Sequence, residues 1–207
     1  MPKLYAMPGT CALAPNIAIA WTEAPIEVVT MAYGDHKKDA YLKVNDKGKV
    51  PALQTDDGRV LTEAAAILGY IQEEHGGALR PADAFGRARV AEALSYFTSE
   101  VHAAYGPHFA KQKFAQSDAA QDEVQKAAYD TLRGHYERMN NKLADAGDWW
   151  LGEKSVADAY LYVLTRWVEQ TPIKLRDYPT LSAFRDEMEA DEGVKAALAR
   201  QDMKPVG

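Results

Sequence analysis

The chain of 207 residues carries 24 Lys and Arg against 30 Asp and Glu, which gives a formal net charge of -6. A protein that coats nucleic acid needs a basic surface to displace counterions, so this balance argues against nucleic acid as a partner. Hydrophobic residues make up 47% of the chain, which is ordinary for a globular protein, and no run stays apolar for long enough to predict a membrane span.

The first residues predict a strand followed by a buried helix. Leu4–Met7 is a short apolar run before a Pro-Gly pair, which interrupts it too early for a signal peptide and favours a cytoplasmic protein. Residues 12–21 are rich in Ala, Leu and Ile and predict a helix with Pro15 in its first turn. The single cysteine, Cys11, would stand at the start of this helix, and it can form no intrachain disulfide.

The next segments complete a compact α/β domain. Strands are expected at 26–31, 50–55 and 59–61, and a short helix at 39–44. The last two strands flank Asp-Asp-Gly, which is typical of a hairpin, and Thr62 is the expected N-cap of a helix that runs to about Glu74. The order β-α-β-α-β-β-α predicts a first domain over residues 1–77.

Beyond a Gly- and Pro-containing linker at 78–86, the hydrophobic pattern changes to a helical period. Apolar residues recur at steps of three and four, and no strand pattern follows Leu61. Residues 87–207 are therefore predicted to form an all-helical bundle of about five helices. Ser155 and Asp158 have the spacing of a capping box, which indicates a structural role.

The position of Cys11 leaves two interpretations open: a reactive thiol or a buried, inert one. The partial positive charge of a helix N-terminus lowers the pKa of a thiol, whereas burial makes a cysteine inert. A lone cysteine also lacks the second thiol of a redox pair, so disulfide chemistry would need an external thiol. The five histidines and Cys11 show no metal-ligand spacing, and no metal site is expected.

Three other positions have both structural and binding interpretations. A cis bond before proline is uncommon, so Pro51 alone suggests a strand start; were the bond cis, the Val50 backbone could pair with an extended peptide. Glu63 and the N–H of Ala64 could hold an amino-acid head group, although the same residues suit an ordinary helix start. His102 lies at the edge of an apolar stripe, where histidines are commonly structural.

Taken together, five segments resemble the glutathione S-transferases, and the bacterial beta class most closely. They are Lys3–Pro15, Asn45–Leu53, Leu61–Ile67, Ser99–His102 with Tyr105, and Gly152–Leu161. The resemblance spans essentially the whole chain. It implies a thioredoxin-like N-terminal domain, an all-α C-terminal domain, glutathione as co-substrate and no metal.

The resemblance also implies roles for single residues at the glutathione site. Cys11 would face the glutathione sulfur, and His102 would approach it from the helical domain. Val50 would bond the cysteinyl backbone beside a cis Pro51. Glu63 and Ala64 would hold the γ-glutamyl head group.

Further residues follow from the same resemblance. Tyr5 would lie near the site as a catalytic group, and Lys49 would contact glutathione. Either His36 or Lys37 would contact the glycyl carboxylate. The family is dimeric, which implies a homodimer in which Ser99 and Glu100 reach the glutathione of the partner subunit; these two residues complete the implied glutathione contacts.

The activity implied is conjugation of the glutathione thiolate to small hydrophobic electrophiles, as in detoxification. Three alternatives stay open. One is a glutathione-dependent thiol-disulfide oxidoreductase or peroxidase that uses Cys11 covalently. Another is a non-catalytic ligand-binding protein of the same fold. The third is a dehalogenase or isomerase with the same co-substrate, since substrate choice depends on pocket shape.

Overall fold

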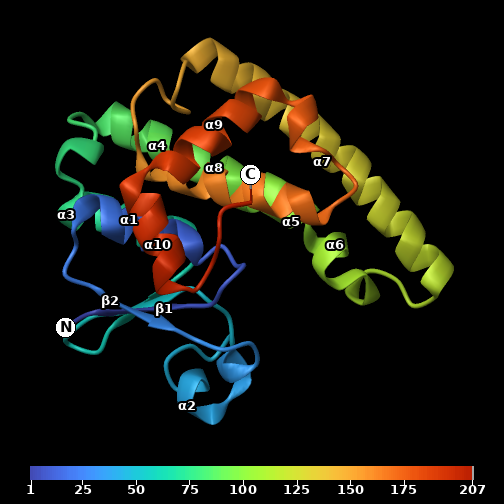
Figure 1. Ribbon diagram of the computed structural model, residues 1–207. Coiled ribbons are helices and arrows are strands. Elements are labelled where there is room, and N and C mark those ends of the chain that lie inside the picture. Colours follow the sequence, from blue (N-terminus) through green and yellow to red (C-terminus); the bar gives the residue numbers. More distant parts are fainter. Residues whose placement is uncertain (207) are drawn as a thin grey trace.

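The computed structural model describes residues 1–206, in which a small mixed sheet is followed by a helical half (Figure 1). The strands are β1 (Lys3–Ala6), β2 (Glu27–Thr30), β3 (Ala52–Gln54) and β4 (Val60–Thr62), in the order β2-β1-β3-β4. β1 pairs parallel with β2 and antiparallel with β3, and β3 pairs antiparallel with β4. Every strand expected from the sequence is present. Gly207, the predicted end of the second domain, lies outside the described residues.

The helices of the first half are α1 (Leu13–Thr22), α2 (Asp39–Leu42) and α3 (Ala64–His75). They confirm the predicted order of elements. The prediction of Thr62 as N-cap of α3 is wrong: Thr62 pairs with Ala52 as the last residue of β4, so α3 begins two residues later. Glu63 takes the cap position instead, with φ at 71°.

The helical half confirms the predicted all-α domain but contains more helices than the five expected. They are α4 (Ala84–Tyr96), α5 (His102–Ala104), α6 (Gly106–Ala110), α7 (Asp118–Ala146), α8 (Val156–Trp167), α9 (Pro179–Ala190) and α10 (Glu192–Arg200). The apolar stripe expected from Val90 to Ala104 divides between α4 and α5 because a π-helical turn, η3 (Phe97–Val101), interrupts it. The 3-10 turns are η1 (Asp35–Lys37), η2 (Gly77–Leu79), η4 (Lys111–Lys113), η5 (Val168–Gln170) and η6 (Leu175–Asp177).

α1 is the helix on which the two halves meet. α8 and α10 pack against α1, as α3 also does, so its residues from Leu13 to Ile19 are all buried. A helix that is apolar on every side must be covered on every side, and the last helix returns to cover it (Figure 1). The amide of Asn16 donates to Ala197 O at 2.9 Å, and Arg200 donates to Asn16 Oδ1 at 3.1 Å.

The start of α8 is fixed by the predicted capping box. The buried carboxylate of Asp158 accepts hydrogen bonds from the N–H groups of Trp150 and Ser155, each at 2.8 Å, and from the Ser155 hydroxyl at 3.0 Å. These bonds attach α8 to the loop that follows α7. They thereby set the position of the side chains that α8 directs towards the first half.

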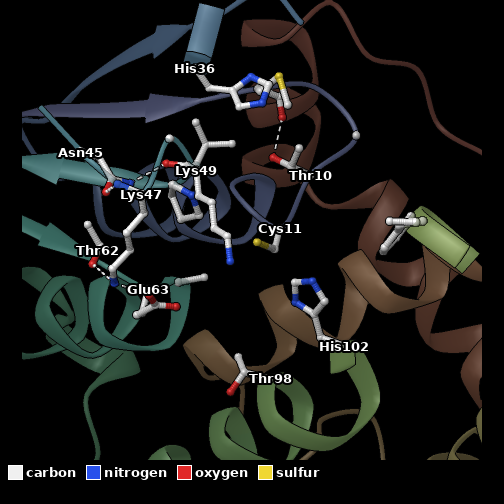
Figure 2. Close-up of a pocket in the computed structure, with 18 of the residues that line it drawn as sticks. Thr10, Cys11, His36, Asn45, Lys47, Lys49, Thr62, Glu63, Thr98 and His102 are labelled. Carbon is white, nitrogen blue, oxygen red and sulfur yellow. Dashed lines mark hydrogen bonds and ion pairs between the residues drawn. The ribbon is translucent and has the colours of Figure 1, made fainter. Parts of the chain in front are cut away.

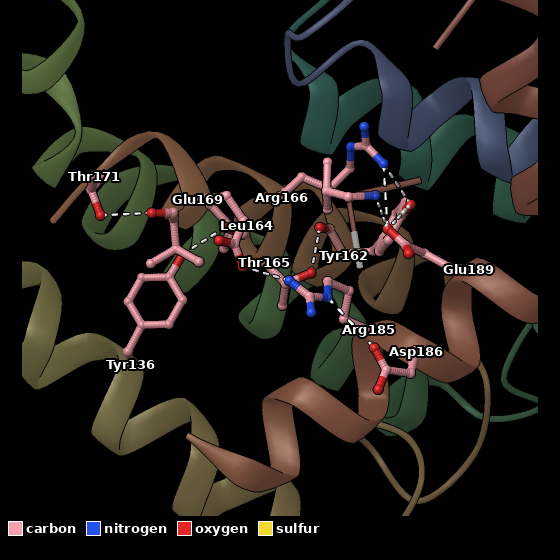
Figure 3. Close-up of polar contacts among 12 residues, drawn as sticks. Tyr136, Tyr162, Leu164, Thr165, Arg166, Glu169, Thr171, Arg185, Asp186 and Glu189 are labelled. Atoms are coloured by element: carbon pink, nitrogen blue, oxygen red, sulfur yellow. Dashed lines mark hydrogen bonds and ion pairs between the residues drawn. The ribbon is translucent and has the colours of Figure 1, made fainter. Parts of the chain in front are cut away.

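The last turns of α8 carry a second polar cluster (Figure 3). Arg166, almost fully buried, donates to Tyr162 Oη at 2.9 Å and to Lys204 O at 2.8 Å, and lies 3.6 Å from Glu189. Val206 N–H also donates to Glu189. The segment after α10 is thus held against α8. By length and apolar character, none of the helices within residues 1–206 could cross a membrane.

Candidate functional site

A cavity of about 890 Å³ separates the two halves (Figure 2). It is lined by eight of the residues predicted to bind glutathione or to act in catalysis: Cys11, Lys37, Lys49, Val50, Pro51, Glu63, Ala64 and His102. Three predicted residues, Tyr5, Ser99 and Glu100, do not line it.

The first wall of the cavity includes an open stretch of backbone at Val50. The Val50–Pro51 bond is cis, as the resemblance implies, and β3 begins only at Ala52. Neither the N–H nor the C=O of Val50 hydrogen-bonds any described residue. The preceding carbonyl, of Lys49, accepts from Tyr41 Oη at 2.6 Å and from Asn45 Nδ2 at 2.7 Å, which fixes the segment. Val50 therefore offers a donor and an acceptor to an extended peptide.

Glu63 and the start of α3 form a second feature of this wall. The left-handed φ of Glu63 is uncommon for a residue with a side chain, and such strain clusters at ligand sites. Its carboxylate lies 2.8 Å from Lys47 Nζ, and this contact holds the pKa of Glu63 below its usual value. The first N–H groups of α3, from Ala64 onwards, have no intrahelical acceptor. The N–H groups at the start of α3 can thus bind an anion, and the adjacent carboxylate of Glu63 can bind a cation.

Cys11 lies directly before the N-cap of α1 and is partly exposed to the cavity. Burial raises the pKa of its thiol to about 11, and the nearby hydroxyl of Tyr160 and the charge of Lys49 lower it by less. The effect of desolvation on the pKa of Cys11 is therefore larger than that of the helix N-terminus, which favours the interpretation of an inert thiol. In the free protein Cys11 is a thiol at neutral pH.

The opposite wall is formed by side chains of α5 and α8. His102 Nδ1 lies 2.7 Å from the hydroxyl of Tyr160, and its ring packs edge-on against Trp167 at 4.7 Å between centroids. Trp167 Nε1 donates to Gly9 O at 2.9 Å, which ties α8 to the loop before Cys11. Burial, followed by the charge of Lys49, lowers the pKa of His102, so its imidazole is neutral at neutral pH.

Tyr160 and Trp167 were not identified as site residues from the sequence. Both belong to the apolar stripe of α8, where a buried aromatic residue is expected to pack in the core. Their role in the site becomes visible only in the fold, which places Cys11 and His102 beside these two side chains. No local motif could have supplied this signal.

His36 and Lys37 enter the cavity differently. Lys37 Nζ donates to Gly48 O at 2.8 Å, so this ammonium is already engaged. His36 also lines the cavity, and its buried Nδ1 has no hydrogen-bond partner among the described residues.

The predicted residues outside the cavity have partners of their own. The hydroxyl of Tyr5 donates to Gln54 Oε1 at 3.2 Å, and its ring packs on Tyr41. Ser99 donates to Ser95 O at 2.7 Å, and Glu100 is exposed beside it in the π-helical turn. Neither Ser99 nor Glu100 lines the cavity of its own chain, whereas the preceding residue, Thr98, does.

One part of the cavity lining is apolar. The rings of Phe109 and Trp167 meet edge-on at 5.0 Å between centroids, and Ala103 and Ala110 line the cavity beside them. This composition is typical of a site for a small apolar ligand. Within residues 1–206, no group of three or more His, Cys, Asp or Glu side chains is placed to hold a metal ion.

Comparison with known proteins agrees with this geometry. The family models described as "Glutathione S-transferase, N-terminal domain" and "Glutathione S-transferase, C-terminal domain" match residues 2–73 and 87–192. The chain is 32% identical over 204 residues to glutathione S-transferase GST-4.5 of Xanthomonas campestris, covering 97% of this chain and 99% of that protein.

Two solved structures are also similar along their whole length. A glutathione S-transferase from Xylella fastidiosa superposes with a TM-score of 0.92 at 35% identity, covering 99% of this chain and 100% of that one. A sphingomonad glutathione S-transferase complexed with glutathione superposes with a TM-score of 0.86 at 36% identity, covering 98% of this chain and 100% of that one.

Proposed function

The chain belongs to the glutathione S-transferase family, and from this premise we propose that its cavity conjugates the glutathione thiolate to small hydrophobic electrophiles. The observation that supports this most directly is the unpaired backbone of Val50, which lies in one cavity with Glu63, Cys11 and His102. The Val50 backbone and Glu63 suit the main chain and head group of a peptide-like ligand. Cys11 and His102 provide surroundings suited to its thiol.

Glutathione would lie extended along Val50, whose N–H and C=O pair with its cysteinyl backbone. The γ-glutamyl ammonium would join Lys47 at the carboxylate of Glu63, while the γ-glutamyl carboxylate accepts from the N–H groups at the start of α3. His36 is better placed than Lys37 for the glycyl carboxylate, because Lys37 is held by Gly48.

In this pose the sulfur points at the start of α1. The helix N-terminus and the charge of Lys49 both favour a thiolate there, since Lys49 already lowers the pKa of Cys11 and of His102. Lowering the pKa of a thiol from about 9 to about 7 raises its thiolate fraction at neutral pH by roughly a hundredfold. The apolar region around Phe109 and Trp167 would hold the electrophile opposite the sulfur.

Binding is the first test of this proposal. Isothermal titration calorimetry with reduced glutathione is expected to show one site per chain, and conjugation of a model aryl halide should saturate with glutathione. Absence of binding at millimolar glutathione would contradict the proposal at its root.

The raised pKa of Cys11 favours transfer over covalent catalysis by this residue. Replacement Cys11→Ala is therefore expected to keep the conjugation rate within about twofold of wild type, because hydrogen bonding by a thiol is weak. Reduction of a glutathione mixed disulfide serves as the counterpart assay. Loss of conjugation in this variant would instead support the thiol-disulfide alternative.

We also propose a beta-class homodimer in which Ser99 and Glu100 reach the glutathione of the partner subunit. Both residues are exposed on the π-helical turn and do not line the cavity of their own chain, which supports this arrangement. Sedimentation equilibrium is expected to give twice the chain mass of 22.8 kDa. In a dimer, replacement Glu100→Gln would change glutathione affinity without altering the cavity of its own chain.

The remaining proposals concern organisation and location. We propose domains at 1–77 and 87–207 with a linker at 78–86, and limited proteolysis within the linker would test this division. A free thiol and a need for reduced glutathione fit a reducing compartment, so we place the protein in the cytoplasm with a role in detoxification. Cell fractionation with an antibody would test that location.

A further inference from the structure

The hydroxyl of Tyr160 lies between the thiol of Cys11 and the ring of His102. Its oxygen is 2.7 Å from His102 Nδ1. The Cys11 thiol lies near enough for this hydroxyl to lower its pKa. Tyr160 is 1% exposed, and within the described part of the chain its hydroxyl is hydrogen-bonded to the ring of His102. Because a hydroxyl has one hydrogen and two acceptor lone pairs, Tyr160 either donates to His102 Nδ1 or accepts from it.

We propose that Tyr160 is a positioning residue that holds the hydrogen of the His102 imidazole on Nε2 and so presents an N–H donor to the cavity. A neutral imidazole carries one N–H, and the second nitrogen is an acceptor. Which nitrogen carries the hydrogen is set by the partner of the other one. Here that partner is the Tyr160 hydroxyl at Nδ1.

Two arrangements of hydrogens satisfy the three groups. In one, Cys11 S–H donates to Tyr160 and Tyr160 O–H donates to Nδ1 of His102. In the other, Nδ1–H donates to Tyr160 and Tyr160 O–H donates to the sulfur. A thiol sulfur is a weak acceptor and an imidazole nitrogen a strong one, so the first arrangement is the more stable.

The surroundings of Cys11 and His102 keep both side chains neutral, as both arrangements require. Lys49 lies close enough to lower the pKa of both Cys11 and His102, whereas Glu63 raises both, and burial opposes charge on each. Cys11 therefore keeps its hydrogen and His102 stays neutral at neutral pH. The tautomer of His102 is then decided by Tyr160 rather than by ionisation.

The orientation of the ring directs the N–H usefully. Trp167 packs edge-on against His102, and Figure 2 shows the ring directed towards Cys11 and the cavity. Among residues 1–206, no group hydrogen-bonds Nε2. If glutathione binds as proposed above, this N–H donates to its thiolate. His102 then stabilises the anion without taking its proton, which leaves to solvent.

Nitrogen-15 NMR of the free protein tests the tautomer directly, without glutathione. The wild-type spectrum is expected to show His102 protonated on Nε2, and Tyr160→Phe to show a mixture of both tautomers. Tyr136→Phe is the matched control: Tyr136 on α7 is equally buried, donates to Leu164 O of α8 at 2.6 Å (Figure 3), and does not line the cavity. This control should leave the His102 signals unchanged.

A second readout uses the complex with glutathione. In Tyr160→Phe, the pKa of the bound thiol, followed by ultraviolet absorption of the thiolate, is expected to rise by about one unit, a roughly tenfold smaller thiolate fraction below that pKa. The KM for glutathione should stay within about twofold, because Tyr160 makes no contact with the backbone-binding groups.

A wild-type spectrum with the hydrogen on Nδ1 would overturn the inference, and this measurement remains decisive even if Tyr160→Phe does not fold. An unchanged tautomer in Tyr160→Phe would overturn it equally. The Nε2–H spectrum without any calorimetric binding of glutathione would reject the proposed function and leave the role of Tyr160 standing. Binding with the opposite tautomer would reject the role of Tyr160 alone.

Discussion

The two walls of the cavity are built from different material. The wall of the first half offers main-chain groups and the charged side chains of Lys47, Lys49 and Glu63, together with residues from earlier in the chain such as Cys11 and Lys37. The helical wall offers aromatic side chains and an imidazole that lie far apart in sequence, from His102 to Trp167. The binding groups of the first wall lie mainly on one segment, residues 47–64, whereas the second wall exists only once α5 and α8 are packed. The first is therefore suited to holding a constant peptide and the second to tuning chemistry.

Removing the support of the helical wall should have the largest effect. Replacement Asp158→Ala leaves the N–H groups of Trp150 and Ser155 and the Ser155 hydroxyl without their buried acceptor. We expect the free energy of unfolding in urea to fall by about 3–5 kcal/mol. Asp148→Ala, an exposed change in the same loop, should cost less than about 0.5 kcal/mol. Similar stability of both variants would show that α8 is held by other contacts.

Weakening the first wall should next affect affinity rather than chemistry. Replacement Glu63→Gln removes the carboxylate proposed to hold the γ-glutamyl ammonium, and a hydrogen bond to a charged group contributes about 1.5–3 kcal/mol. Calorimetry is expected to show glutathione affinity reduced by roughly ten- to hundredfold. Glu74→Gln, an exposed change at the other end of α3, is the control. An unchanged affinity for Glu63→Gln would remove the γ-glutamyl group from this position.

Lys49 crosses the division between the walls, because it belongs to the first half and its charge acts on the helical one. It lowers the pKa of His102 and of Cys11, so Lys49→Met should raise both pKa values. The pKa of a bound glutathione thiol should rise for the same reason. The acidic limb of kcat/KM against pH is expected to move upward by about half to one unit. At a pH below that limb the rate falls by roughly three- to tenfold. Lys43→Met, exposed after α2, should leave the profile in place.

The smallest effect is expected at Lys37, whose side chain is already hydrogen-bonded within the first wall. Lys37 is engaged with Gly48, so Lys37→Met should lower glutathione affinity by less than about threefold. His36→Gln should lower it more, by roughly three- to tenfold, if the imidazole meets the glycyl carboxylate. Calorimetry of both variants orders them, and the reverse order would assign the carboxylate to Lys37.

The same difference explains how far the sequence could be interpreted. The elements of the first half, and site residues such as Val50 and Glu63, follow from short segments with recognisable turn and strand patterns. Thr62 was misassigned because pairing in the sheet extended β4 past the expected cap. Tyr160 could not be identified, since its role depends on the approach of Cys11 and His102 from two other elements. The π-helical turn likewise interrupts a stripe whose spacing looked continuous.

The return of α10 to α1 has a consequence for biosynthesis. The apolar surface of α1 leaves the ribosome early, whereas the helix that covers it, bonded to Asn16 through Ala197 and Arg200, is translated among the last segments. During that interval the nascent chain exposes the hydrophobic surface of α1. Surfaces of this kind bind chaperones and aggregate at high expression. Productive folding of the thioredoxin-like module should therefore wait for nearly complete translation.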